Sequence, residues 1–223
     1  MIKPTIKTAT SLNADQAIGT VVLAFSADPA ARWLYPDSHQ YLMNFPGFVQ
    51  AFAGKAFEHN SAYCVDAGGL GAALWLPPGV HANENTLIAL LQRTVAKEKQ
   101  RDVFATLEQM DSYHPSESHW YLPMIGVDPA HQAQGYGSAL LQHTLLACDR
   151  DHKLAYLESS SPKNIPLYER HGFELLGTIQ VGKSPPIFPM LRKPRRIVLA
   201  EGNDHSSRRA TGSAPGSITV LEG

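Results

Sequence analysis

The spacing of hydrophobic and polar positions changes several times along the chain, and each change predicts a structural element. Alternation every second residue predicts short strands, whereas recurrence every three or four residues predicts helices. The breaks between these segments coincide with Pro and Gly residues, which end helices and strands. In the first half, the pattern predicts a strand at 4–10, a helix at 13–26, a turn at 32–37, a helix at 40–57, strands at 61–66 and 71–76 joined through residues 67–69, and one or two helices within 84–110.

From Trp120 onward the pattern becomes that of an α/β protein. Residues 120–127 form a near-continuous apolar run, which predicts a strand buried on both faces. The helix that follows places Leu141, Leu145 and Cys148 on one face. The remaining predicted elements are a strand at 154–157, a short helix at 164–171 closed by Gly172, and strands at 173–181 and 186–191. This order of strands and helices predicts an α/β fold with a parallel pair near its middle.

The composition fits one globular domain followed by a tail. Of the 223 residues, 43% are hydrophobic and 17% are charged, as in soluble globular proteins. We expect residues 1–198 to form the domain. Residues 199–223 contain Gly, Ser, Pro and charged residues but no aromatic residue, so they are predicted to be a disordered C-terminal tail. The basic run at 192–196 is expected to be part of a solvated terminus.

Charge and cysteine content narrow the function class. The chain has 19 Lys and Arg against 20 Asp and Glu, a net charge of −1, which excludes the overall basic field of a dedicated nucleic-acid-binding protein. Cys64 and Cys148 provide neither a disulfide framework nor a metal quartet, and they are expected to be small buried hydrophobes in the reducing cytoplasm. No apolar run approaches the roughly 18–20 residues that span a bilayer. We therefore expect no membrane or nucleic-acid partner and no metal.

The segment 127–141 carries the first chemical signal. It reads as a buried strand, a loop with Gly135 and Gly137, and an amphipathic helix. The N–H groups at a helix N-terminus are unpaired, and glycines let a phosphate approach them closely. The segment is therefore a candidate pyrophosphate site. It lacks the Gly-Lys-Ser/Thr ending of a P-loop and the third glycine of a dinucleotide fingerprint, which weighs against an ATPase and an NAD enzyme.

Two motifs in order identify a resemblance to a known family. Gln132-x-x-Gly135-x-Gly137 after a buried strand resembles the pyrophosphate motif of the GCN5-related N-acetyltransferases (GNAT). Residues 157–173 are similar to that family's next strand, its Tyr-bearing helix and its terminal Gly-Phe. The resemblance covers about residues 3–194 in element order. The segments most similar to the puromycin N-acetyltransferase-like subgroup are Ser161–Phe173, Asp28-Pro29-Ala30 with Arg32, and Arg192-Lys193-Pro194.

This resemblance implies a fold and an activity. The fold would be a central mixed sheet of about six to seven strands flanked by helices. The activity would be direct transfer of the acetyl group of acetyl-CoA to a primary amine of a small molecule, antibiotic-like amines included. The chain would act as a monomer or a homodimer. Acetylation of a peptide or protein, and a CoA-binding sensor without turnover, remain alternatives.

The resemblance also assigns residues to the cofactor. The backbone of Ile125 and Val127 would pair with the pantetheine amides, and the loop after them would hold the pyrophosphate. Lys163 or Arg170 would add positive charge there. Ser161 stands where the family usually has Asn, and Asn164 is the alternative contact. The complete expected set is Ile125, Gly126, Val127, Gln132, Ala133, Gln134, Gly135, Tyr136, Gly137, Ser138, Ser161, Asn164 and Tyr168.

The same resemblance and the chemistry of acetyl transfer suggest catalytic residues. Tyr168 matches the family's tyrosine, and its phenol suits protonation of the departing thiolate. The attacking amine must be neutral, which requires a base. Glu158 is the candidate base, and His119 is its rival because an imidazole titrates near neutral pH. His131 and His171 are expected to face solvent. Aromatic candidates for the acceptor pocket are Trp33, Tyr35, Tyr113, Trp120 and Tyr121.

Overall fold

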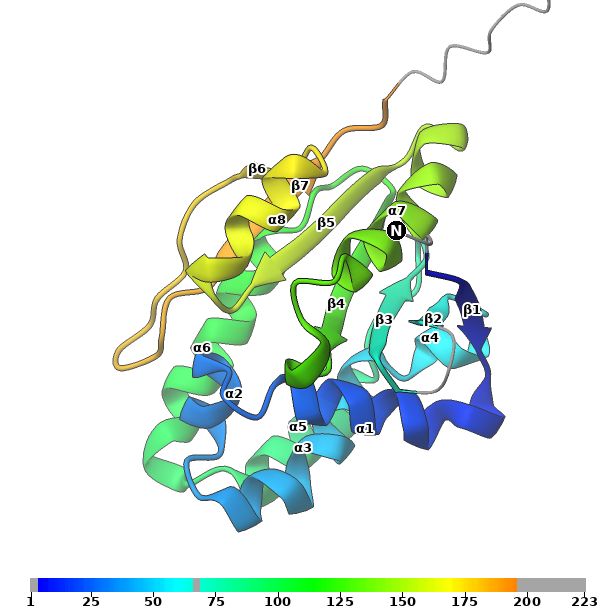
Figure 1. Cartoon of the computed structure of the whole chain (residues 1–223). Helices are drawn as coiled ribbons and strands as arrows, with labels where there is room; N and C mark the ends of the chain where they lie inside the picture. Colours follow the sequence, from blue (N-terminus) through cyan, green and yellow to red (C-terminus); the bar gives the residue numbers. More distant parts are fainter. Residues whose placement is uncertain (1–3, 66–68, 196–223) are drawn as a thin grey trace, which may run out of the picture.

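The computed structural model describes residues 4–65 and 69–195, which form a seven-stranded mixed sheet flanked by helices (Figure 1). The strand order is β1-β2-β3-β4-β5-β7-β6. The strands are β1 (Ile6–Ala9), β2 (Ala62–Val65), β3 (Gly71–Leu76), β4 (His119–Val127), β5 (Leu154–Ser159), β6 (Glu174–Leu175) and β7 (Phe188–Arg192). The mixed α/β sheet expected from the sequence is confirmed. The predicted tail and most of the predicted connection between β2 and β3 lie outside the described residues.

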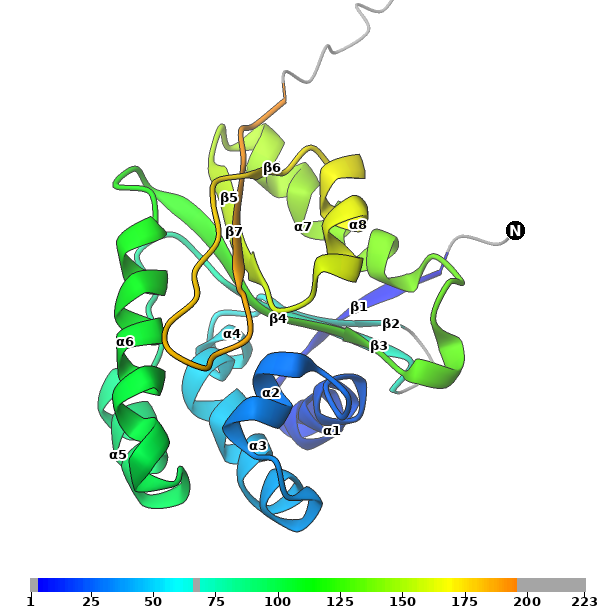
Figure 2. The ribbon, with the colours of Figure 1, turned by 90° about the vertical axis from the view of Figure 1, so that its left-hand side faces the viewer.

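Helices cover both faces of the sheet. Figure 2 shows α7 and α8 on one face and α1 to α4 on the other, with α5 and α6 beside them. Their bounds are α1 (Ala14–Ala24), α2 (Pro29–Leu34), α3 (Ser38–Ala53), α4 (Lys55–Glu58), α5 (Glu84–Thr94), α6 (Lys97–Tyr113), α7 (Tyr136–Arg150) and α8 (Ile165–Arg170). Each face has its own hydrophobic cluster. Trp75 and Leu140 belong to the α7 side, while Phe45 and Tyr156 belong to the α1–α3 side.

The parallel pair expected near the middle of the sheet is β4 with β5, joined by α7. Among the described strands, the other neighbours are all antiparallel. Because α7 contributes Leu141, Leu145 and Cys148 to the buried core, the apolar stripe read from the sequence faces the sheet. Cys64 is only partly buried, and both cysteines are free thiols.

Two local expectations were wrong. The predicted turn at 32–37 begins instead inside helix α2, because the Asp28 carboxylate accepts hydrogen bonds from the N–H groups of Ala30 and Ala31 at 3.0 Å each and caps that helix. The predicted strand at 173–181 is reduced to the two residues of β6. Beyond it the chain leaves the sheet and returns through a single bridge between Ile179 and Ile187.

The start of the basic run at 192–196 is part of the core, which corrects the expectation of a solvated terminus. The Arg192 guanidinium is almost fully buried and makes two hydrogen bonds, of 2.7 and 2.8 Å, to the Asp149 carboxylate. It also donates to the carbonyl oxygen of His171 at 2.9 Å. His171 is itself buried, so it does not face solvent as expected. The last strand is thereby joined to the end of α7.

Strand β4 is not buried evenly on both faces, contrary to the expectation from its apolar run. Met124 and Gly126 are buried, whereas Pro123, Ile125 and Val127 alternate with them and are partly exposed. These partly exposed residues border a cavity between the helices and the sheet. Some of the apolar residues of β4 that the sequence pattern assigned to the core therefore line a cavity instead.

Candidate active site

The cavity lies where β4 and β5 part and has a volume of about 560 Å³. The two strands pair only from His119 with Leu154 to Leu122 with Leu157. Beyond this point β4 continues to Val127 without pairing with β5. Peptide groups on this side of β4 therefore lack a strand partner and are available to a ligand with amide groups.

The local sequence of β4 explains why the strands part. Between Tyr121 and Met124, β4 has one residue more than the β3 segment from Leu74 to Leu76 opposite it. Such a β-bulge bends the strand that carries it. Pro123 lies in the bulge and has no N–H to donate to a neighbouring strand. The bulge and the proline together end the pairing with β5.

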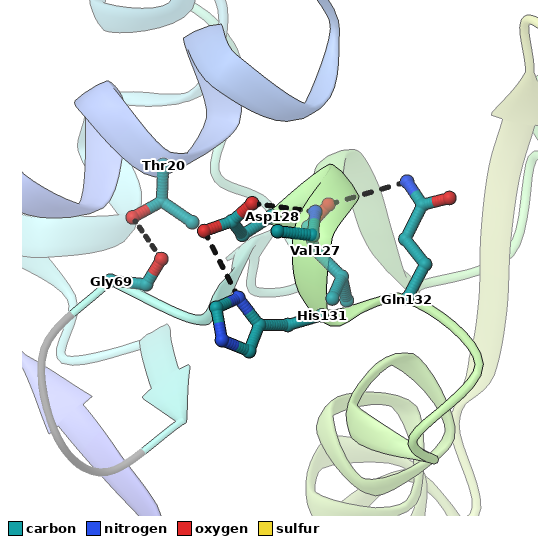
Figure 3. A network of polar contacts seen from close by, with 7 residues as sticks. Thr20, Gly69, Val127, Asp128, His131 and Gln132 are labelled. Atoms are coloured by element: carbon teal, nitrogen blue, oxygen red, sulfur yellow. Dashed lines mark hydrogen bonds and ion pairs between the residues drawn. The ribbon is translucent and has the colours of Figure 1, made fainter.

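The loop after β4 is shaped by unusual backbone angles and by Asp128. Ala133 and Gly135 have φ angles of 60° and 86°, and Gly135 is the N-cap of α7. Asp128 accepts from the N–H of Ala130 at 2.9 Å and contacts His131 Nδ1 at 3.2 Å (Figure 3). Residues in the left-handed region next to a helix start turn successive N–H groups toward one point, which suits a phosphate.

The side chain of Gln132 lies across the end of β4. Its Nε2 donates to the carbonyl oxygen of Val127 at 3.4 Å (Figure 3). This is one of the backbone groups expected to pair with pantetheine. A ligand that uses the Val127 carbonyl must displace a long and therefore weak hydrogen bond.

Most of the expected cofactor residues are brought together on this cavity. Gln134 is exposed and does not line it, and Ser161 is replaced in the lining by its neighbour Ser160. Arg170 lines the cavity, whereas Lys163 does not. The expected residues that line it are Ile125, Gly126, Val127, Gln132, Ala133, Gly135, Tyr136, Gly137, Ser138, Asn164 and Tyr168.

Two of these residues also have structural roles that the sequence did not indicate. A Cβ on Gly126 would meet the Cβ of Ala24 at 2.5 Å, so this glycine allows α1 to pack closely on β4. The Ser138 hydroxyl is hydrogen-bonded to His171 Nε2 at 2.6 Å. We therefore expect Ser138 to offer its backbone N–H, rather than its hydroxyl, to a ligand.

Tyr168 is buried on α8 and lines the cavity together with Asp28. Burial raises the pKa of Tyr168, and the negative charge of Asp28 raises it further. The phenol therefore stays protonated at neutral pH and is available as a proton donor. Asp28 is fixed by its helix-capping bonds and by a hydrogen bond from the Ser160 hydroxyl.

Glu158 also lines the cavity and is joined to two histidines. Its Oε1 lies 3.4 Å from His114 Nε2, and the Glu158 side chain is only 3% exposed. His114 Nδ1 lies 3.1 Å from His119 Nε2, and His119 Nδ1 lies 2.8 Å from the carbonyl oxygen of Glu117. The rival bases Glu158 and His119 are thus two ends of one connected group, and His114 is the residue that connects them.

The hydrogen-bond directions in this group follow from the carbonyl of Glu117. A carbonyl can only accept, so His119 Nδ1 carries a proton and a neutral His119 accepts at Nε2. His114 then donates from Nδ1, which leaves the lone pair of its Nε2 facing the Glu158 carboxylate. Two acceptors face each other here, so Glu158 Oε1 lacks a hydrogen bond.

Aromatic rings enclose this group. The ring of His114 lies 4.6 Å from that of Tyr121 and 4.4 Å from that of Tyr156. Burial, followed by the negative charge of Glu158, raises the pKa of both tyrosines. Burial lowers the pKa of His119, so its imidazole is neutral at pH 7.

The predicted acceptor aromatics are mostly elsewhere. Trp33 lines the cavity, whereas Tyr35, Tyr113, Trp120 and Tyr121 do not. The cavity residues that the sequence reasoning missed are Asp28, Phe45, Phe48 and Phe52. The three phenylalanines recur along α3 at intervals of three and four residues, a pattern that the sequence shows but that is equally typical of a core-facing helix.

The segment from α5 to β6 also matches a known family. Residues 90–175 match the family model described as the acetyltransferase (GNAT) domain. This segment is therefore similar to a GNAT acetyltransferase domain. The chain is 34% identical over 85 residues to an uncharacterized N-acetyltransferase from Schizosaccharomyces pombe. That match covers 37% of this chain and only 34% of the length of the yeast protein.

Solved acetyltransferase structures share the fold of this chain. A Corynebacterium glutamicum protein described as histone acetyltransferase HPA2 and related acetyltransferase superposes with a TM-score of 0.62 at 24% identity, over 89% of this chain and all of that one. Polyamine N-acetyltransferase from Drosophila melanogaster superposes with a TM-score of 0.59 at 13% identity, over 85% of this chain and 99% of that one. Arylalkylamine N-acetyltransferase 2 from Aedes aegypti superposes with a TM-score of 0.60 at 12% identity, over 87% of this chain and all of that one.

Residues 4–65 and 69–195 contain no group of three or more His, Cys, Asp or Glu side chains that could hold a metal ion. Within the same ranges, no helix is both long enough and apolar enough to span a bilayer.

Proposed function

We propose that this protein transfers the acetyl group of acetyl-CoA directly to a primary amine of a small molecule. The observation that carries the proposal is the unpaired part of β4, between Pro123 and Val127, with Glu158 and Tyr168 on the same cavity. A peptide-like arm can pair with this strand, while a base and a proton donor lie beside it. The match to the GNAT domain supports the same chemistry.

The residues around the cavity fit acetyl-CoA. The free side of β4 accommodates the amide groups of pantetheine, with Gln132 moving off the Val127 carbonyl. The loop with Ala133 and Gly135 accommodates the pyrophosphate, and Arg170 contributes a positive charge. When bound, acetyl-CoA supplies an activated acetyl group.

Side chains of the protein then accept one proton and donate another. Glu158 accepts a proton from the amine nitrogen, so that the nitrogen lone pair forms the new C–N bond while the thioester C–S bond breaks. Backbone N–H groups of β4 stabilise negative charge that develops on the carbonyl oxygen. Tyr168 donates its phenolic proton to the sulfur. The products are the N-acetylated amine and CoA with a free thiol.

The proton taken up by Glu158 leaves through the two histidines. His114 Nε2 faces the carboxylate, and its Nδ1 is hydrogen-bonded to His119. His119 is partly exposed and lies at the start of β4, so it can pass a proton to water. Glu158 is the base that contacts the amine, and His114 and His119 act through it.

The first test measures thiol release from acetyl-CoA with a panel of primary amines, beside a calorimetric titration with CoA. Puromycin belongs in the panel, because the segments Asp28–Ala30 and Ser161–Phe173 resemble the puromycin N-acetyltransferase-like subgroup. We expect CoA to bind and at least one amine to release thiol. CoA binding without release from any amine would instead favour a sensor, and the absence of CoA binding would refute the proposal.

Replacing Tyr168 with Phe tests the proton donor. We expect kcat to fall roughly 100-fold, because the thiolate would leave without a proton from the protein. The affinity for CoA in the titration should be unchanged, since the ring still packs against Phe173 at a centroid distance of 6.1 Å. Full activity in this variant would remove Tyr168 from the mechanism.

Replacing His119 with Gln tests the proton path. We expect kcat/KM to fall about tenfold at pH 7, with a smaller fall at higher pH, where hydroxide can accept the proton. Added imidazole should restore part of the lost rate, which a purely structural role of His119 would not allow. An unchanged pH profile without rescue would mean that Glu158 loses its proton by another route.

A further inference from the structure

The segment between β6 and β7 brings a buried serine to the cavity. Figure 2 shows this segment running down beside α6. Ser184 lies in it, is only 3% exposed and lines the cavity together with Pro185 and Ile187. The strand that follows, β7, pairs its Pro189 with Glu158. The segment therefore continues directly into the strand beside the proposed base.

Hydrogen bonds within the segment hold Ser184 in place. Its N–H donates to the carbonyl oxygen of Val181 at 2.8 Å, and the N–H of Val181 donates to the Ser184 hydroxyl at 2.9 Å. Gln180 Nε2 donates to the Ser184 carbonyl oxygen at 3.1 Å. Ile179 and Ile187 close the loop with two backbone hydrogen bonds of 2.8 and 2.9 Å. The hydroxyl is therefore positioned before a ligand arrives, which lowers the cost of binding to it.

Helix α6 supports this turn. The N–H of Lys183 donates to Asp102 Oδ2 at 3.4 Å. Gly182 has a φ of 54°, and a Cβ there would collide with the Asp102 carboxylate, so the turn lies directly against the helix. Thr106, one turn further along the same helix, also lines the cavity. Asp102 thus fixes the place of Ser184 relative to this wall.

Ser184 keeps a hydroxyl proton that the protein does not use. Within the described residues, the Ser and Thr side chains that line the cavity are Thr106, Ser138, Ser160 and Ser184. The first three are hydrogen-bonded to the Asp102 carbonyl, to His171 and to Asp28, respectively. The Ser184 oxygen only accepts, from Val181. A buried hydroxyl is costly without a partner for its proton, so an oxygen atom of a ligand in the cavity is its expected partner.

The charges around the cavity favour a neutral oxygen as this partner. Among the described lining residues, Arg170 is the one Lys or Arg, and it is assigned to the proposed pyrophosphate site. The acidic side chains there are Asp28 and Glu158. A carboxylate on the acceptor molecule would therefore enter beside two acidic groups without a cation of its own. An ether or carbonyl oxygen requires only a donor.

From these contacts we infer that Ser184 determines acceptor specificity by donating a hydrogen bond to a neutral oxygen in the body of the amine. The inference rests on the proposed function and specifies its substrate class. The hydroxyl keeps the bond that it accepts from Val181 and gives its proton to the substrate oxygen. An amine with only carbon at this place leaves the donor unpaired and is used less well.

The test uses three pairs of amines in the thiol-release assay. The members of a pair have the same chain length and differ by an ether oxygen in place of one methylene group. The pairs are 2-methoxyethylamine with n-butylamine, 3-methoxypropylamine with n-pentylamine, and 4-methoxybutylamine with n-hexylamine. We expect kcat/KM to be about tenfold higher for the ether in at least one pair, the effect of one neutral hydrogen bond. For 4-aminobutanoate we expect it to be roughly 100-fold lower than for n-pentylamine, because of the unpaired carboxylate.

Three variants locate the donor. Ser184→Ala should abolish the ether preference, and differences in amine basicity cancel because the same pair is compared in both proteins. Thr106→Val removes a hydroxyl from the same cavity, but one whose proton goes to the Asp102 carbonyl, so the preference should stay. Gln180→Met removes another hydrogen bond to the turn while keeping the Ser184 hydroxyl. It should also keep the preference, which separates loss of the donor from loosening of the turn.

The outcomes separate this inference from the proposed function. Equal use of ether and alkane in all three pairs, or an ether preference that survives in Ser184→Ala, would overturn the role of Ser184 while leaving acetyl transfer intact. Turnover of other amines of the panel but of none of the ethers, or loss of the preference in Gln180→Met as well, would do the same. Equal use of 4-aminobutanoate and n-pentylamine would overturn the requirement for a neutral oxygen. Failure of every amine, with CoA still bound in the titration, would overturn the proposed function and with it the inference.

Discussion

Replacing Glu158 with Gln is expected to lower kcat/KM for the amine by about 10²- to 10⁴-fold, the range that general-base catalysis contributes. The amide has nearly the same shape as the carboxylate but cannot accept the amine proton. The side chain is only 3% exposed, so bulk water is poorly placed to replace it. Steady-state thiol release over pH 6–9 measures the effect.

A matched control for this variant is Glu169→Gln. Glu169 is an exposed carboxylate on α8 and does not line the cavity, so its loss should leave turnover unchanged. The affinity for CoA should stay the same in both variants, because neither side chain belongs to the expected cofactor contacts. Equal activity of wild type and Glu158→Gln would show that the base is another group, with His114 as the next candidate because of its 3.4 Å contact.

Replacing Arg192 with Met is expected to destabilise the fold by about 3–5 kcal/mol. The guanidinium is nearly fully buried and pairs with Asp149, whose side chain is 12% exposed. Its removal leaves the largely buried Asp149 carboxylate with a hydrogen bond from the Arg195 N–H at 2.7 Å but without the guanidinium that pairs with both of its oxygens. A loss of this size is a large fraction of the roughly 5–15 kcal/mol that keeps a domain folded. Urea unfolding followed by circular dichroism measures it.

The double variant Asp149→Leu with Arg192→Met distinguishes the buried charge from simple loss of packing. Removing both partners should recover much of the stability, because no isolated charge remains. Arg150→Met is the surface control, since Arg150 pairs with Asp151 in solvent and should leave the unfolding midpoint unchanged. A double variant as unstable as the single one would show that Arg192 acts through its hydrogen bond to His171 instead.

The sequence was most informative where one physical effect dominated. The apolar run at 120–127 predicted β4, and the strand–helix–strand order that follows predicted the parallel pair with β5. The turn expected at 32–37 was wrong in its first part, because Asp28 caps a helix that continues to Leu34. The strand expected at 173–181 was wrong because only Glu174 and Leu175 pair with β7, and beyond them a single bridge joins Ile179 to Ile187.

The candidate site was predictable in its cofactor half and less so in its acceptor half. Contiguous residues from Ile125 to Ser138 supply the backbone groups of the cofactor half, so a local motif can reveal them. The acceptor half combines residues far apart in the chain, such as Phe48 and Glu158. The role of His114 depends on a contact across 44 positions of sequence, and no local pattern distinguishes it from a surface histidine.

The unpaired part of β4 is, in effect, a sheet edge inside the molecule. Free strand edges invite pairing with other chains and are a common source of aggregation. Here the edge is recessed, because Ala24 and Phe25 of α1 lie on one side of the cavity and Leu167 and Tyr168 of α8 on the other. Gln132 covers its last carbonyl. These walls hinder pairing with a strand of a second protein chain, while leaving the edge to the slender pantetheine arm that we propose binds there.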